Sequence, residues 1–137
     1  MLAHIGNLNW LAVLLAVIVG QVFLTVWFAV IFADPWAKAY GAKDKAEHTA
    51  AIPPWTYGIG LICMILLVIG IGVIQRAAGI SGFGGGLEAG IVLGICFALA
   101  TALPGYAFLA RYGAAKIAIG SQVCLIILLS VILAVWQ

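Results

Sequence analysis

Four long apolar stretches, separated by short polar connections, most constrain how this sequence can fold. Each is long enough for an α-helix to cross a hydrocarbon core about 30 Å thick, which takes roughly 20 residues. The predicted spans are residues 10–32, 55–74, 87–109 and 115–136. A soluble domain of 137 residues could not bury the apolar surface of a chain that is 66% hydrophobic and 7% charged. The sequence therefore predicts an all-α membrane protein, a single domain of four transmembrane helices in a small bundle.

Tryptophan residues lie at the ends of the predicted spans, as amphipathic indole rings do at the headgroup level of a bilayer. The first span follows Asn9, a favourable helix N-cap, and ends where Asp34 and Pro35 begin a polar loop. Residues 1–9 contain no Lys or Arg, so we expect no cleaved signal peptide. The predicted interfacial anchors are Trp10, Trp36, Trp55 and Trp136.

Basic residues are distributed unevenly between the two predicted sides of the membrane. The first and third connections lie on one side, and the second connection, on the other side, contains only Arg76. The basic residues of the first group are Lys38, Lys43, Lys45, Arg111 and Lys116. Cytoplasmic loops carry the excess of Lys and Arg. We therefore expect the loop of residues 33–54 in the cytoplasm and both termini outside it.

Cysteine and histidine residues show no pattern of a reactive or metal-binding site. Cys63, Cys96 and Cys124 all fall within predicted spans without C-x-x-C spacing, so we expect buried, inert thiols that fill helix contacts. His4 and His48 fall on opposite predicted sides and cannot share a metal. The sequence predicts no catalytic residue, no metal site, no cofactor and no nucleic-acid partner.

The glycine-rich run "GISGFGGG" at residues 79–86 favours a flexible turn between spans. A phosphate-binding loop would need a following Lys and Ser or Thr, and here Leu87 and Glu88 follow. We expect Glu88 in the first turn of the third helix, where a carboxylate complements the helix dipole and can pair with Arg76.

Two amides are the notable polar side chains deep within the predicted spans. Measured from the anchors Trp10 and Trp136, Gln21 and Gln122 lie at depths of roughly 16 and 21 Å. They could hydrogen-bond to each other if the first and fourth helices are neighbours. The alternative is that each amide bonds a nearby backbone carbonyl or Thr25, which favours a structural role over a substrate contact.

Small residues recur every four positions along the third predicted span. This small-residue stripe consists of Gly86, Gly90, Gly94, Ala98 and Ala102, and it lets another helix backbone approach closely. Two interpretations stay open. The stripe packs against the first or second helix of the same chain, or it receives a partner protein or a second copy of this chain.

The aromatic anchors and glycines resemble the pattern of a bacterial integral-membrane family known as domain of unknown function 1761. The residues that carry this resemblance are Asn9-Trp10, Trp27-Phe28, Phe32, Pro35-Trp36, Lys38 and Gly41, followed by the Gly-rich third span, Arg111, Lys116 and the final Leu133-Ala134-Val135-Trp136. The basic first loop and Pro104 depart from it. The resemblance implies a four-span domain in the bacterial inner (cytoplasmic) membrane and no known activity.

The function therefore has to be inferred from the class of protein. We expect an accessory or structural subunit that packs against another membrane protein in the lipid bilayer. The alternative is a small oligomeric transporter or channel. An enzyme is not expected, because no nucleophile, base or metal cluster stands out. The missing mid-span charge also argues against proton-coupled exchange.

Overall fold

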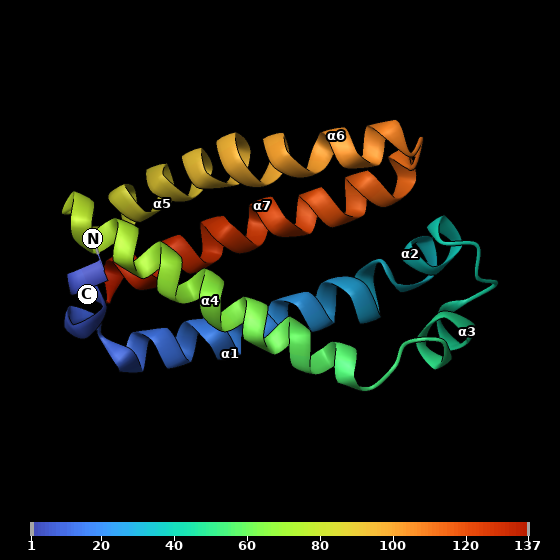
Figure 1. The fold of residues 1–137 in the computed structure, drawn as a ribbon, viewed down its shortest axis with the longest axis horizontal. Helices are drawn as coiled ribbons and strands as arrows, with labels where there is room; N and C mark the ends of the chain where they lie inside the picture. Colours follow the sequence, from blue (N-terminus) through green and yellow to red (C-terminus); the bar gives the residue numbers. More distant parts are fainter. Residues whose placement is uncertain (1, 137) are drawn as a thin grey trace.

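The computed structural model describes residues 2–136, and its long helices lie side by side in an elongated bundle (Figure 1). The long helices are α1 (Trp10–Val26) continued by the π-helix η2 (Trp27–Ile31), α4 (Trp55–Ala78), the run of α5 (Gly82–Val92), π-helix η3 (Leu93–Leu99) and α6 (Ala100–Phe108), and α7 (Tyr112–Val135). The short helices are η1 (Leu2–Asn7), α2 (Ala33–Ala39) and α3 (Lys45–Ala50).

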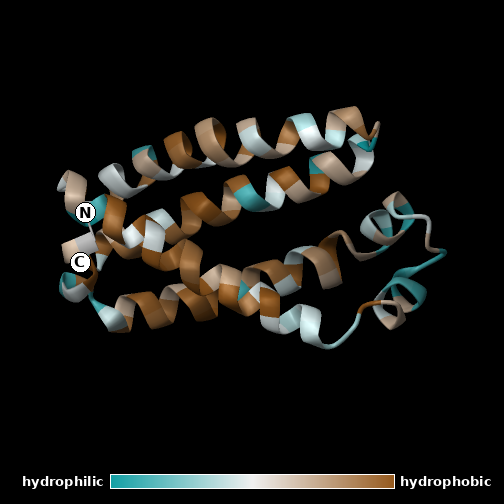
Figure 2. Cartoon of the chain, viewed as in Figure 1, coloured by the Kyte–Doolittle hydropathy of each residue, from teal (hydrophilic) through white to brown (hydrophobic). Residues whose placement is uncertain are grey.

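The four long helical segments are long and apolar enough to cross a membrane. Figure 2 shows the hydrophobic colour along these helices and the hydrophilic colour mainly at their ends and connections. No strand occurs between residues 2 and 136. In hydrocarbon a helix satisfies its backbone hydrogen bonds internally, which is why this composition folds into helices. The prediction of an all-α membrane protein with four transmembrane helices in a small bundle is confirmed.

The connection between the second and third spans is much shorter than expected. α4 continues to Ala78 and α5 already begins at Gly82, so most of the glycine-rich run is helical. The turn itself uses Gly79 and Gly82, whose φ angles of +66° and +73° favour glycine. The prediction of a flexible loop was wrong for residues 83–86, because an apolar helix in lipid continues wherever the backbone can bond to itself.

The first span begins as the sequence predicts and ends in an irregular turn. The Asn9 side chain accepts hydrogen bonds from the backbone N–H groups of Leu11 and Ala12, and so caps α1. At the other end the helix widens into η2, and the indole nitrogen of Trp27 donates to the carbonyl of Ile117 on α7 at 3.1 Å. This bond holds the end of the first span against the fourth.

α7 is the central helix of the bundle. It contacts α1, α4 and the whole α5–η3–α6 run, and 44% of its most apolar window is buried, against 11% for the first span. The hydrophobic core forms where Ala16, Val68 and Leu129 meet from three different helices. Both described ends of the chain and the α4–α5 turn lie at one end of the bundle, and α2, α3 and the α6–α7 turn lie at the other (Figure 1).

The glycines of the small-residue stripe lie against α7. A Cβ atom added at Gly86 would come within 2.8 Å of the Ser130 carbonyl oxygen, and one at Gly90 within 2.7 Å of the Ile127 Cα. Of the two interpretations, these glycines follow packing within the chain, but the helix they meet is α7 and not the first or second: a short α6–α7 turn makes α5 and α7 antiparallel neighbours.

The second half of the stripe is less tightly packed. Gly94 faces the Val123 side chain of α7, whereas Ala98 and Ala102 are half-buried. Gly94 and Ala98 both lie within the π-helix η3, which changes the helical period, so residues four apart no longer share one face. The helix continues through Pro104, one of the residues that depart from the family resemblance.

Candidate functional site

The loop between the first two spans folds into two short helices that cover one end of the bundle. Asp44 caps α3 by accepting the backbone N–H of Glu47 at 2.9 Å, and Glu47 accepts the N–H of Lys43 at 2.7 Å. This reciprocal arrangement resembles a capping box. Asp34 on α2 accepts the N–H of Lys45 at 3.3 Å, which joins the two short helices. The loop is therefore an ordered structure.

Aromatic rings and one arginine tie this loop to the rest of the bundle. The rings of Trp36 and Tyr40 have centroids 4.8 Å apart, and those of Tyr40 and His48 are 6.0 Å apart. Arg111, at the α6–α7 turn, lies over the Tyr40 ring at 5.3 Å and donates to the Ala39 carbonyl at 3.3 Å. A cation over an aromatic face is attractive, and here it joins two loops distant in sequence.

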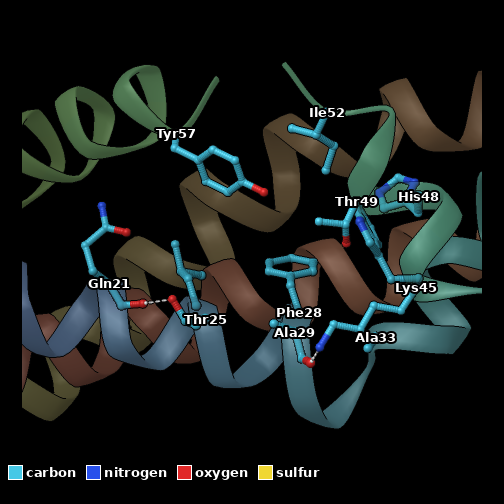
Figure 3. Close-up of a pocket in the computed structure, with 12 residues that line it drawn as sticks. Gln21, Thr25, Phe28, Ala29, Ala33, Lys45, His48, Thr49, Ile52 and Tyr57 are labelled. Atoms are coloured by element: carbon cyan, nitrogen blue, oxygen red, sulfur yellow. Dashed lines mark hydrogen bonds between the residues drawn. The ribbon is translucent and has the colours of Figure 1, made fainter. Parts of the chain in front are cut away.

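A cavity of about 270 Å³ lies under α3, between the end of the first span and the start of the second (Figure 3). We call it the α3 cavity. Its lining residues are Gln21, Leu24, Thr25, Phe28, Ala29, Ala33, Trp36, Lys45, His48, Thr49, Ile52 and Tyr57. The cavity thus combines apolar walls with hydroxyl, amide, imidazole and ammonium groups, and no carboxylate lines it.

Lys45 reaches from α3 to the backbone of the first span. Its Nζ donates to the carbonyl oxygen of Ala29 in η2 (Figure 3). The last carbonyls of a helix lack an intrahelical partner, and a cation there also complements the helix dipole. The ammonium group is thereby held at the wall of the α3 cavity.

The intramembrane amides are not bonded to each other. Gln21 lines the α3 cavity and its backbone carbonyl accepts the Thr25 hydroxyl at 2.8 Å. Gln122 lies half-buried on α7, and no hydrogen bond joins the two side chains within residues 2–136. Although α1 and α7 are neighbours, the hydrogen bond between the two amides, one of the two alternatives, is not formed, because Gln21 faces the cavity beside α4.

The predicted anchors occupy two kinds of position. Trp10, Trp55 and Trp136 are exposed at the ends of long helices, as interfacial side chains would be. Trp36 lies instead on α2, half-buried against the ring of Phe28 at 4.8 Å.

Three other expectations about side chains differ from the structure. The described part of the chain shows no ion pair between Arg76 and Glu88, and Glu88 lies beyond the first turn of α5 because the helix begins at Gly82. The thiols of Cys63, Cys96 and Cys124 are exposed on the helix surfaces rather than buried. A thiol is a small, weakly polar group, so facing lipid carries little penalty.

One buried polar residue escaped the sequence interpretation. Gln75 had been assigned to a connection, yet it lies on α4, is 0% exposed, and donates to the Ser130 carbonyl. Gly79 was the signal that could have placed it, since a glycine with positive φ is the usual residue just past a helix C-terminus. Lys45, His48 and Tyr57 were also missed as a group, because their proximity depends on how the loop folds.

These features define a small four-helix membrane protein with an ordered loop and a mixed polar and apolar cavity at one end of its bundle. Within residues 2–136, no three His, Cys, Asp or Glu residues are grouped so as to hold a metal ion.

The chain belongs to the family described as protein of unknown function, DUF1761, whose model matches residues 11–134. The resemblance inferred from the anchors and glycines is confirmed. Comparisons with curated proteins and with solved structures found no match.

Proposed function

We propose that this protein is an accessory or structural subunit that packs against a helix of another membrane protein. The observation that supports this is an apolar groove of about 310 Å³ between α4 and η3, which we call the α4–η3 groove. Its lining residues are Leu66, Leu67, Gly70, Ile71, Ile74, Leu93, Phe97 and Ile126. The chain closes its own α5–α7 interface with glycines but leaves this groove open.

The groove has the shape and chemistry of a helix-packing surface. Leu66 and Phe97 on its rims are 64% and 60% exposed, and a Cβ added at Gly70 would meet no atom within 4 Å. A second cavity, of about 470 Å³, lies beside it between the α4–α5 turn and η3, and includes Ser81 and Glu88. An apolar groove with polar groups near one membrane face fits a transmembrane helix that carries a polar residue near its end.

Covalent cross-linking in native membranes tests whether a helix of another protein occupies the α4–η3 groove. We expect a photo-cross-linking amino acid at Phe97 or Leu66 to trap one defined protein, and the same group at Ile18, an exposed position on α1, to give no such product. Gly70→Leu should fill the groove and reduce copurification of that protein. Gly60→Leu is the matched control, because it is also on α4 and also meets open space.

The outcomes separate the possible functions. A cross-link between two copies of this chain, with no second protein, would favour the small oligomeric transporter or channel. Cross-links to lipid alone at Phe97 and Leu66 would contradict both. The proposal assigns no enzymatic step and no cofactor.

We also propose that the chain lies in the bacterial cytoplasmic membrane with both termini outside the cytoplasm. The charge distribution supports this orientation. Lys38, Lys43, Lys45 and Arg111 belong to the end of the bundle with α2 and α3, whereas Arg76 belongs to the end with the described termini. The membrane potential and insertion machinery favour the basic end in the cytoplasm.

A further inference from the structure

We propose that the α3 cavity binds the acidic head group of an anionic amphiphile. In this site Lys45 and His48 face the head group, and Leu24, Phe28 and Ile52 contact the start of its apolar chain. The site shares no residue with the α4–η3 groove, so this proposal does not depend on the proposed subunit role.

The charge of the cavity selects an anion. Lys45 carries an ammonium group with three N–H donors, and one of them is used by the Ala29 carbonyl. The remaining donors have no carboxylate partner within residues 2–136. The loop carboxylates are instead engaged by backbone N–H groups: Asp34 by that of Lys45, Asp44 by that of Glu47, and Glu47 by that of Lys43. A bound acidic group would therefore meet an ammonium group that forms no ion pair with a carboxylate among residues 2–136, although Asp34 and Asp44 line a neighbouring cavity with Lys45.

Neutral polar groups extend the site toward the membrane interior. Gln21 on α1 and Tyr57 on α4 also line the α3 cavity, on the side away from Lys45 (Figure 3). The side-chain amide of Gln21 makes no hydrogen bond within residues 2–136. Unsatisfied amides are costly in an apolar surrounding, so this group is suited to bind a ligand oxygen or water next to it.

The dimensions favour an amphiphile over a small soluble anion. Gln21 and Ala29 are eight positions apart, so the cavity extends about 12 Å along the first span. The volume of about 270 Å³ is slightly below the range of whole-ligand sites, roughly 300 to 1,000 Å³. It accommodates a head group and the first part of a chain. The rest of the chain would continue into the bilayer, which a wholly water-soluble ligand does not require.

Binding to the full-length protein in an uncharged detergent provides the test. The probe is laurate below its critical micelle concentration, measured by calorimetry, with dodecanol as an uncharged molecule of the same chain length. We expect laurate to bind, dodecanol to bind at least about tenfold more weakly, and Lys45→Gln to weaken laurate binding about tenfold. Lys43→Gln is the matched control, because Lys43 lies two residues away and does not line the cavity.

Two further variants keep the test informative if Lys45→Gln disturbs the loop. Lys45→Arg keeps the charge and should retain binding, whereas Gln21→Leu alters the opposite end of the cavity and should weaken it.

A second experiment counts the lipids that stay bound to the protein from nanodiscs by native mass spectrometry, comparing phosphatidylglycerol with phosphatidylcholine. Binding of laurate alone identifies a free fatty acid, and retention of phosphatidylglycerol alone identifies a phospholipid.

Three results would overturn the proposal. The first is that neither laurate nor phosphatidylglycerol binds. The second is that dodecanol binds as tightly as laurate. The third is that Lys43→Gln weakens binding as much as Lys45→Gln, which would mean that the general charge of the loop attracts the anion and the cavity does not.

Discussion

The side-chain nitrogen of Gln75 on α4 donates a hydrogen bond to the backbone carbonyl of Ser130 on α7 at 2.8 Å, and Gln75 is completely buried. This bond joins the second span to the central helix near the end of the bundle that holds both described chain ends. A buried amide in this position favours one rotation of α4 relative to α7, because sliding or turning either helix would break the hydrogen bond to the Ser130 carbonyl.

Replacing Gln75 with Ala should lower the stability of the bundle by about 1–2 kcal/mol, since it removes the bond and leaves a small void. The measurement is thermal unfolding in mild detergent, followed by circular dichroism. Ser130→Ala is the control: it keeps the acceptor carbonyl and removes a buried hydroxyl that has no hydrogen-bond partner among residues 2–136. Equal losses in the two variants would contradict this assignment.

Gly90→Ala should destabilise the α5–α7 interface by about 1–3 kcal/mol, because the added methyl group would lie 2.7 Å from the Ile127 Cα and the backbone has to move. Gly94→Ala should have a smaller effect, since the nearest atom there, at 3.2 Å, belongs to the Val123 side chain. The effects of Gly90→Ala and Gly94→Ala are measured as the melting temperature and the monodispersity of each variant in detergent. Gly84→Ala, on the same helix but in open space, is the control and should be as stable as the wild type. If Gly90→Ala is also as stable as the wild type, α5 and α7 do not pack closely there.

Asn9 has two separable roles, which a pair of substitutions distinguishes. Its side-chain oxygen caps α1, and its side-chain nitrogen donates to the Trp136 carbonyl at 2.9 Å. Asn9→Ala loses both and should cost about 1–2 kcal/mol, whereas Asn9→Asp keeps the cap and should lose about half of that. Melting temperatures in detergent give the comparison. If Asn9→Asp is as unstable as Asn9→Ala, the cap contributes nothing measurable.

The orientation of the bundle can be tested by labelling from outside the cell. A variant in which Cys63, Cys96 and Cys124 are replaced by Ala should fold, because these thiols are exposed on the helix surfaces. Lys43→Cys in that background should resist a membrane-impermeant maleimide in intact cells and react after permeabilisation. A cysteine at His4 should react in intact cells. The reverse pattern would invert the topology.

The class of protein and the number of spans follow from the apolar runs of the sequence. Apolar runs of this length form helices in lipid, where a helix satisfies its own backbone, so hydropathy predicts the number of spans, while α4 and α5 extend beyond the predicted bounds into the second connection. The N-cap at Asn9 was also readable, because capping depends on residues close in sequence. The family could also be recognised from the sequence, and its model matches residues 11–134.

Which face of each helix meets another helix depends on how the bundle packs. Hydropathy could not predict that the stripe beginning at Gly86 packs on α7, that Gln75 is buried or that Cys96 is exposed. In water, apolar periodicity reveals the buried face of a helix. In lipid, the surroundings are as apolar as the core, so this signal disappears and close packing between particular side chains selects the arrangement. The α3 cavity also depends on tertiary packing, because Lys45 and Gln21 line one cavity only after the loop has folded against the bundle.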